Sequence, residues 1–146
     1  MTMTAREAFD RGTESFNAHD MDGFAETVAD DVVFEAPGGV RGQGKPACIQ
    51  FYNSWLDAFP DAHVHVHGVH IVDDVVVEEG TFTGTHKHVL KGPMGEIPAT
   101  GRPVKIAYVQ VLRYRGGKYI SFNLMFDRLA MLEQLGLIPA SSSVAG

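Results

Sequence analysis

The spacing of apolar positions along the chain changes once, close to Pro60. Before Pro60, apolar side chains recur every three or four residues, which is the spacing of one face of an α-helix. This pattern predicts helices over 5–17, 21–29 and 46–59, with a short strand over 30–37. Thr4 with Glu7 three residues later predicts a capping box on the first helix, and Asp20 is the expected cap of the second.

After Pro60 apolar and polar positions alternate, as they do in strands with one buried face. Strands are expected over 62–67, 75–85, 104–114 and 118–125, with a turn at Asp73-Asp74. Gly116-Gly117 predicts a tight hairpin between the last two strands, because glycine reaches positive φ at little steric cost. The Gly- and Pro-rich segment 87–102 is expected to be a loop with short strand pieces, and Asp127 to cap a last helix over 128–135.

The predicted hairpin carries polar atoms on a face that is otherwise apolar. That face is expected to hold Tyr108, Gln110 and Leu112 on the first strand and Ile120, Phe122 and Leu124 on the second. A polar group buried without a partner costs roughly 1–3 kcal/mol, so these polar atoms need partners or a ligand. The hairpin therefore predicts the wall of a site.

The opposite face of the hairpin is also apolar, through Val109, Val111 and Met125. Monomers seldom expose a contiguous apolar patch. We therefore expect a homodimer that packs through the sheet.

Helices followed by a run of strands predict an α+β fold, with helices packed over the concave side of a curved antiparallel sheet. Such an arrangement encloses a cone-shaped pocket, and the inward candidates here are mostly aromatic and aliphatic. A mainly apolar pocket with a few polar groups is typical of a small-molecule site. We expect one domain over 1–146, with a flexible tail from about 138.

Composition narrows the function classes. The net charge is −6 with a pI near 5.5, and the Lys and Arg residues are scattered, so neither nucleic acid nor an anionic membrane is an expected partner. No apolar run approaches the roughly 20 residues of a membrane span, and the first residues lack the apolar core of a signal peptide. Cys48 is the single cysteine, which leaves no internal disulfide and favours a cytoplasmic location.

Three histidines, His63, His65 and His67, share one face of a predicted strand. Alternate residues of a strand lie roughly 7 Å apart, so these rings share a metal only if they converge or another chain contributes. Because Val64 and Val66 occupy the buried face, the histidines are expected to face solvent or a dimer partner. Adventitious Zn or Ni binding is the alternative, and no metal site is predicted.

Several short motifs resemble the SnoaL-like polyketide cyclases, a family of the nuclear transport factor 2-like superfamily. They are Phe59-Pro60-Asp61, Thr81-Phe82-Thr83-Gly84-Thr85-His86, Ile97-Pro98-Ala99-Thr100-Gly101-Arg102, Gly117-Lys118, Asp127 and Gln134-Leu135-Gly136. The resemblance extends over about 5–137. It implies an α+β cone, usually homodimeric, in a family whose cyclases close a ring by intramolecular aldol condensation without metal or cofactor.

The resemblance also assigns positions to the family's catalytic pair. Its catalytic Asp falls at Leu124, which cannot take a proton, and its His falls at Gln110, which can hydrogen bond but cannot act as a base. His86 stands where the family often has a histidine, and we expect it to anchor a loop.

The candidate catalytic residues are Gln110, Tyr108 and Asp127, and the candidate ligand-binding residues are Phe34, Trp55, Tyr108, Gln110, Phe122 and Leu124. Each has a structural alternative. Asp127 directly precedes a helix pattern and is expected mainly as an N-cap. Gln110 and Tyr108 could be core residues whose polar atoms are satisfied locally, and Glu35 is a weaker acid–base candidate.

Three hypotheses remain at this stage. The first is an enzyme of cyclase, isomerase or hydrolase type that acts on an apolar carbonyl or polyketide-like compound, without metal or cofactor. The second is a non-catalytic protein that binds an apolar small molecule, because Leu124 and Gln110 replace the family's pair. The third is a dimeric interaction protein whose cavity is incidental.

Overall fold

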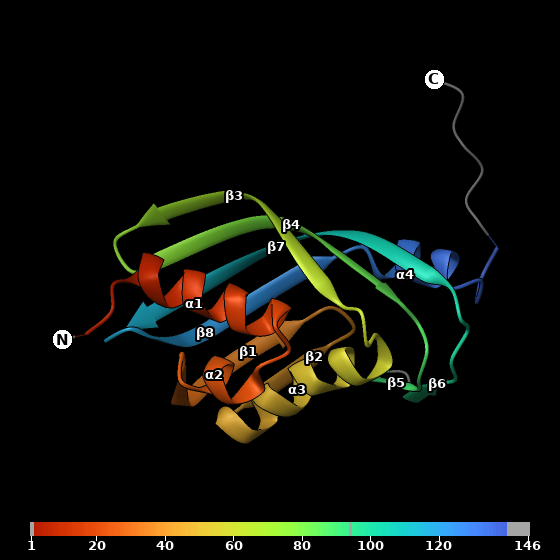
Figure 1. Cartoon of the computed structure of the whole chain (residues 1–146), viewed down its shortest axis with the longest axis horizontal. Coiled ribbons are helices and arrows are strands. Elements are labelled where there is room, and N and C mark those ends of the chain that lie inside the picture. Colours follow the sequence, from red (N-terminus) through yellow and green to blue (C-terminus); the bar gives the residue numbers. More distant parts are fainter. Residues whose placement is uncertain (1, 94, 140–146) are drawn as a thin grey trace.

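Among the described residues, three of the four helices end before Pro60 and six of the eight strands follow it, in line with the change of spacing in the sequence. The computed structural model describes residues 2–93 and 95–139. Its elements in chain order are α1 (Ala5–Asn17), α2 (Met21–Ala25), β1 (Val28–Ala36), β2 (Val40–Gln43), α3 (Lys45–Ala58), β3 (His63–Val72), β4 (Val75–Thr85), β5 (Leu90–Gly92), β6 (Gly95–Ile97), β7 (Pro103–Arg115), β8 (Lys118–Phe126) and α4 (Arg128–Gln134) (Figure 1).

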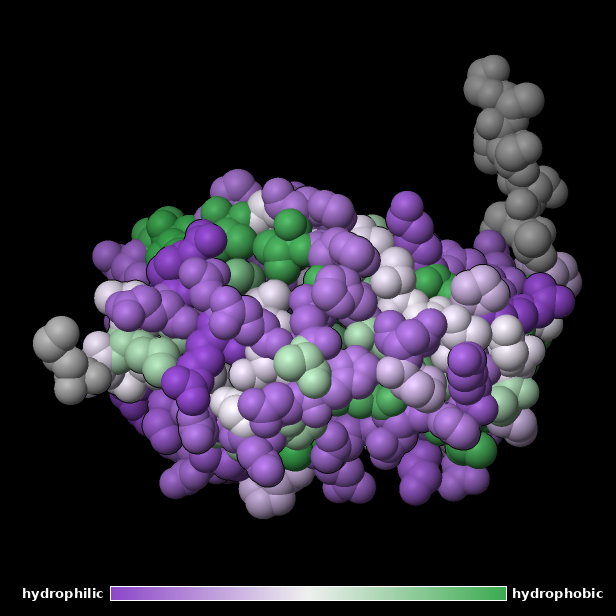
Figure 2. Space-filling model, viewed as in Figure 1, coloured by the Kyte–Doolittle hydropathy of each residue, from purple (hydrophilic) through white to green (hydrophobic). Residues whose placement is uncertain are grey.

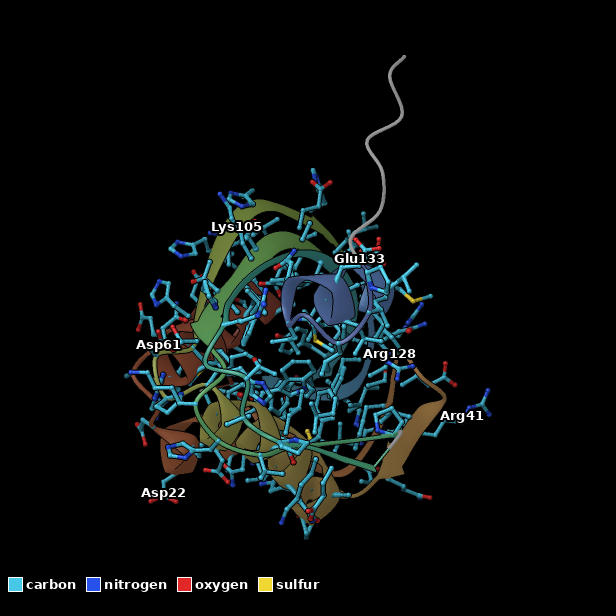
Figure 3. All side chains as sticks on the ribbon, turned by 90° about the vertical axis from the view of Figure 1, so that its right-hand side faces the viewer. Asp22, Arg41, Asp61, Lys105, Arg128 and Glu133 are labelled. Atoms are coloured by element: carbon cyan, nitrogen blue, oxygen red, sulfur yellow. The ribbon has the colours of Figure 1, made fainter. Side chains whose placement is uncertain are left out.

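The large sheet has the strand order β2-β1-β8-β7-β4-β3. The expected antiparallel pairing holds for β3, β4, β7 and β8, whereas β1 joins β8 in parallel, with Phe34 opposite Phe122. Helices α1, α2 and α3 lie on one side of the sheet, and α4 lies at its far end (Figure 1). From the α4 end, the strands curve around interior side chains, while the labelled Asp22, Arg41 and Asp61 point outward (Figure 3). The predicted α+β class with a curved, helix-covered sheet is confirmed.

The first helix begins as predicted. The Thr4 hydroxyl accepts a hydrogen bond from the Glu7 backbone N–H, and the Glu7 carboxylate accepts one from the Thr4 N–H. This capping box satisfies backbone donors that the first turn of a helix leaves free. It fixes the start of α1, whose buried face, including Phe9 and Phe16, covers the sheet.

The second helix is shorter than predicted, because it ends at Ala25 rather than at residue 29. The Thr27 hydroxyl donates to the Phe24 carbonyl, and the Thr27 carbonyl accepts from the Tyr119 N–H. Val28 then pairs with Tyr119 as the first residue of β1. Pairing with a distant strand therefore outweighs the local helical pattern of 26–29.

The hairpin of β7 and β8 turns at Gly116 and Gly117, both at positive φ as predicted. Its register shifts at a β-bulge, so that Arg113 pairs with Ser121 but Tyr114 pairs with Tyr119. The expectation that Ile120 shares the inward face with Phe122 is wrong for this reason, since Ile120 is the extra residue of the bulge. Tyr119, 3% exposed, takes the inward place.

The segment 87–102 contains the short hairpin β5–β6 and is held by His86. His86 is fully buried, its Nδ1 accepts from the Thr100 N–H at 3.2 Å, and its ring stacks on Phe59. The loop-anchoring role predicted for His86 is confirmed. Burial lowers the pKa of this imidazole, which keeps it neutral.

The histidines of β3 point away from the buried side, as predicted. His63, His65 and His67 are exposed, and His67 Nε2 lies 2.7 Å from the Thr81 hydroxyl on β4. Within 2–93 and 95–139, no three His, Cys, Asp or Glu side chains are grouped so as to hold a metal ion.

The outer face of the hairpin carries the apolar patch expected from the sequence, formed by Val109, Val111 and Met125. Val109 and Met125 lie opposite each other and are 42% and 62% exposed, while Val111 is half-buried. Apolar surface also gathers near the turn between β3 and β4 (Figure 2), where Val72 is 71% exposed.

Two further expectations concern the ends of the chain and membranes. The predicted flexible tail lies outside the described residues from Ala140 onward. No helix in the described part of the chain is both long and apolar enough to cross a bilayer.

The cap of α4 gives a first prediction. Asp127 is exposed, and its Oδ1 accepts a hydrogen bond from the Ala130 N–H at 3.0 Å. Asp127→Ala should lower the free energy of unfolding by about 1 kcal/mol, while Asp127→Asn, whose side chain also caps well, should retain most of it. Urea denaturation of the three proteins measures this, and equal losses in both variants would contradict the capping role.

Candidate functional site

A cavity of about 120 Å³ lies between α1–α3 and the inner face of the sheet. Most of its lining residues are aromatic, among them Phe9, Phe51, Tyr52, Trp55 and Tyr119. These rings reach it because helical residues spaced three or four apart share a face, as Phe51, Tyr52 and Trp55 do on α3. The cavity is thus the mainly apolar pocket expected from the sequence.

One carboxylate, that of Glu78, is part of this mainly apolar lining. Glu78 on β4 is 2% exposed and lines the cavity. Alternation along β4 directs Val76, Glu78 and Gly80 to the buried side and Glu79 to the surface. Among the described residues that line the cavity there is no Lys, Arg or His, so none of them offers Glu78 a cationic partner.

Hydrogen bonds from β7 hold the Glu78 carboxylate. The Tyr108 hydroxyl donates to Oε2, and the Gln110 amide donates to Oε1 over 2.6 Å. Glu78 lies directly opposite Gln110 in the register of β4 and β7, and Tyr108 is the next inward residue along β7. The strand pairing therefore places one donor on each carboxylate oxygen.

Gly80 makes room for the tyrosine. It pairs with Tyr108 across the two strands, and a Cβ at this position would lie 2.5 Å from the Tyr108 hydroxyl oxygen and 2.9 Å from the His65 carbonyl. The Tyr108 side chain can therefore lie over Gly80 and reach Glu78 only because residue 80 has no side chain.

Burial and hydrogen bonding act on Glu78 in opposite directions. Burial raises the pKa of its carboxyl above the ordinary value, and the hydrogen bonds from Tyr108 and Gln110 offset part of this rise. The pKa of Tyr108 is also raised, first by burial and then by the charge of Glu78, so the phenol stays protonated. A carboxyl with a raised pKa in a cavity is suited to take and return a proton near neutral pH.

The structure brings four of the predicted site residues together. Tyr108, Gln110, Trp55 and Leu124 all line the cavity. Leu124 lies opposite Gln110 on the neighbouring strand β8 and contributes an apolar side chain beside the polar group.

The remaining predicted site residues lie elsewhere. Phe34 and Phe122 are buried and stack on each other with ring centroids 5.1 Å apart, and both contact Phe51, which lines the cavity. They support the wall and are not among the lining residues. Asp127, the cap of α4, is not among them either. Glu35 is exposed, with an oxygen 3.5 Å from a nitrogen of Arg41.

Sequence reasoning missed Glu78. The signal was present, because Val76, Glu78 and Phe82 fall on one face of the strand by the same alternation that identified Tyr108 and Gln110. Tyr119 was missed because the bulge at Ile120 reverses the expected alternation.

A buried thiol lies behind the aromatic wall. Cys48 is fully buried, with its sulfur 3.6 Å from the hydroxyl of Tyr119. Burial raises its pKa to about 11, so the thiol remains protonated at neutral pH. A protonated, enclosed thiol is a poor nucleophile, and Cys48 is a packing residue.

Comparison with known proteins identifies a family. The family model described as SnoaL-like polyketide cyclase matches residues 6–135. Among curated proteins, none has significant sequence similarity to the chain.

Solved structures share the fold. A candidate SnoaL-like polyketide cyclase from Jannaschia sp. CCS1 has a TM-score of 0.81 and 21% identity, covering 92% of this chain and 93% of its own. IdmH from Streptomyces antibioticus, a candidate polyketide cyclase, has a TM-score of 0.75 and 25% identity over 92% of this chain and 99% of its own. AclR from Streptomyces galilaeus, a candidate hydroxylase, has a TM-score of 0.78 and 22% identity, with coverage of 95% and 85%.

The raised pKa of Glu78 gives a second prediction. Over the pH range above the ordinary value of 4.5, the folded state keeps a proton that the unfolded state has lost. The stability that this proton contributes is present below that value and is lost as the pH rises through the folded-state pKa. The amide of Glu78→Gln does not titrate. The free energy of unfolding of this variant, relative to that of the wild type, should therefore increase as the pH rises.

Urea denaturation of both proteins from about pH 4 to about pH 8 measures this difference. Glu79→Gln is one control, because it makes the same chemical change on the exposed side of the same strand. Since Glu79 also pairs with His70, Glu96→Gln, at an exposed residue of β6, is the second control. A stability difference between Glu78→Gln and wild type that does not change with pH would contradict the assignment.

Proposed function

Because the chain belongs to the SnoaL-like polyketide cyclase family, we propose that it is an enzyme of the cyclase or isomerase type that moves a proton on an apolar carbonyl compound. The observation that carries the proposal is the buried carboxylate of Glu78, held by Tyr108 and Gln110 in a mainly apolar cavity. The bound partner is an apolar small molecule, and cytoplasmic residence, expected from the sequence, is part of the proposal.

The proposed step is proton abstraction next to a carbonyl group. The C–H bond breaks, an O–H bond forms on Glu78, and the electron pair moves toward the carbonyl oxygen to give an enolate. A protonated Glu78 is a weaker hydrogen-bond acceptor than the carboxylate. The Tyr108 hydroxyl can then donate to the enolate oxygen instead. The Gln110 amide holds the carboxyl in place, and the step requires no metal and no cofactor.

This role moves the base to a different strand from the one that the resemblance indicates. Leu124 on β8 provides apolar surface where the family's Asp would lie, and Gln110 occupies the position of its His. Glu78, on β4, lies opposite Gln110 on the other side of β7 and faces the same cavity. Solved structures with this fold include candidate cyclases and a candidate hydroxylase, so the fold alone does not specify the reaction.

A second candidate function is non-catalytic binding of an apolar compound. Leu124 and the aromatic lining favour it, because they bind apolar surface and do not supply chemistry. A buried carboxylate without a catalytic role would, however, carry a cost of desolvation that an amide at the same position avoids.

We also propose a homodimer that packs through the outer face of the sheet. The support is the patch of Val109, Val111 and Met125, which would lie exposed on a lone chain. Burial of such surface contributes roughly 25 cal/mol for each Å² removed from water.

The catalytic proposal is tested by hydrogen–deuterium exchange. Wild-type protein in D₂O should exchange the acidic C–H of a small apolar ketone, such as 2-methylcyclohexanone, faster than buffer does, as followed by NMR. Glu78→Gln should lower the enzymatic rate about 100-fold or more, because it keeps the shape but removes the base. Tyr108→Phe should give a smaller loss.

Glu79→Gln again serves as the control and should exchange the ketone at the wild-type rate. Retention of the wild-type rate in Glu78→Gln would refute the role of Glu78. Binding of the ketone without any exchange above background in the wild type would favour the second candidate function.

The dimer proposal is tested by sedimentation. Wild-type protein at tens of micromolar should sediment as a dimer, whereas Met125→Lys should sediment largely as a monomer, because it places a charge in the apolar contact. Val72→Lys makes the same change at an exposed apolar residue outside the patch and should leave the dimer intact. A monomeric wild type would refute the proposal.

A further inference from the structure

The size of the cavity limits what can lie against Glu78. Its volume is about 120 Å³. An engineered cavity of about 150 Å³ in another protein holds one benzene molecule, and sites for drug-sized ligands span roughly 300–1,000 Å³. The space beside Glu78 is therefore about the size of one six-membered ring, and a system of three or four fused rings would extend beyond it.

The walls of the cavity are closely packed aromatic side chains. The ring of Trp55 lies 5.5 Å from that of Phe82 and 5.6 Å from that of Phe126, and the ring of Tyr52 lies 4.7 Å from that of Phe24. A larger ligand would have to displace several of these rings together. Overpacking of this kind is costly in a close-packed interior.

The charge of the lining limits the ligand as well. An anion would meet Glu78 with no Lys, Arg or His lining the cavity to offset it. A cation would meet a carboxyl whose two oxygens already accept hydrogen bonds from Tyr108 and Gln110. An uncharged ligand avoids both costs.

The polar groups define a pattern for that ligand. The Gln110 amide uses one N–H on Glu78 and has a second N–H and a carbonyl oxygen to offer. A carboxylate is a weak base, so it removes a proton most readily from a C–H whose anion is delocalised over two oxygens. A carbon between two carbonyl groups is of this kind, and one of the carbonyls can accept from Gln110.

We infer that the substrate of this site is an uncharged single-ring 1,3-dicarbonyl compound, in which Glu78 takes the proton from the carbon between the two carbonyls. The inference rests on the proposed function and adds the size, charge and functional groups of the substrate. The C–H bond breaks as an O–H bond forms on Glu78, and return of the proton to carbon or oxygen completes a keto–enol interconversion. No co-reactant is needed.

The test is a binding series in which the ring system grows while the dicarbonyl group stays the same. The probes are 2-acetylcyclohexanone, its two-ring homologue 2-acetyl-1-tetralone, and the corresponding three-ring homologue. Affinity is measured by calorimetry and by the fluorescence of Trp55, the only tryptophan of the chain, which lines the cavity. The affinity for the one-ring compound should exceed that for the three-ring compound by a factor of about ten or more.

Two leucine variants separate cavity size from general loss of stability. Leu124→Ala removes side-chain volume from the wall and should reduce the preference for one ring over two, while Leu56→Ala, buried in the core outside the lining, should leave it unchanged. Equal or tighter binding of the three-ring compound by the wild type would overturn the inference. So would tighter binding of the single-ring cation benzyltrimethylammonium, or no binding of the one-ring compound.

The failure of this inference can be told apart from the failure of the proposed function. Binding of the one-ring dicarbonyl to both wild type and Glu78→Gln, with equal rates of exchange at its central carbon, would refute the catalytic role alone. Exchange that depends on Glu78 and occurs as readily on the three-ring compound would refute the substrate class alone.

Discussion

The register of β4 against β7 is the constraint on which the site depends. It puts Glu78 opposite Gln110 and Gly80 opposite Tyr108, so that each oxygen of the carboxylate meets a donor inside the cavity. A slip of one residue would turn Glu78 toward solvent and Glu79 into the aromatic wall, because successive side chains of a strand face opposite sides. The same pairing orders the strands that line one side of the cavity, so one set of hydrogen bonds supports both the fold and the proposed site.

Glu78 and Leu124, which lie on either side of β7, illustrate how the proposed function relocates an acid–base group without changing the shape of the pocket. The cavity is shaped by side chains on several elements, and inward positions on neighbouring strands of the sheet face the same volume. Glu78 on β4 and Leu124 on β8 flank β7 from either side. If the carboxyl lies at residue 78 instead of residue 124, it contacts a different face of a bound compound.

The sequence predicted the elements well because their signals are local: the Thr4 box, the Gly116-Gly117 turn and the Asp127 cap each act within a few residues. The predictions from sequence fail where pairing with a strand distant in the chain determines the local structure. Val28 leaves the expected helix to pair with Tyr119, and the bulge at Ile120 depends on β7. Glu78 and Glu79 look alike in the sequence, and their opposite environments follow from the pairing of β4 with β7. Tyr108 and Gln110 were found because alternation alone places them inward.

The parallel pairing of β1 with β8 bears on how the chain reaches this structure. Phe34 must meet Phe122, so an early strand finds its neighbour only after the last strand exists. Contacts between segments this far apart in sequence carry a large entropic cost and slow folding. On the ribosome, α1–α3 and β1 emerge long before the strands that cover their apolar faces. Their aromatic side chains are exposed to aggregation during synthesis, and the cavity between these helices and the sheet is complete only after β7 and β8 have been made.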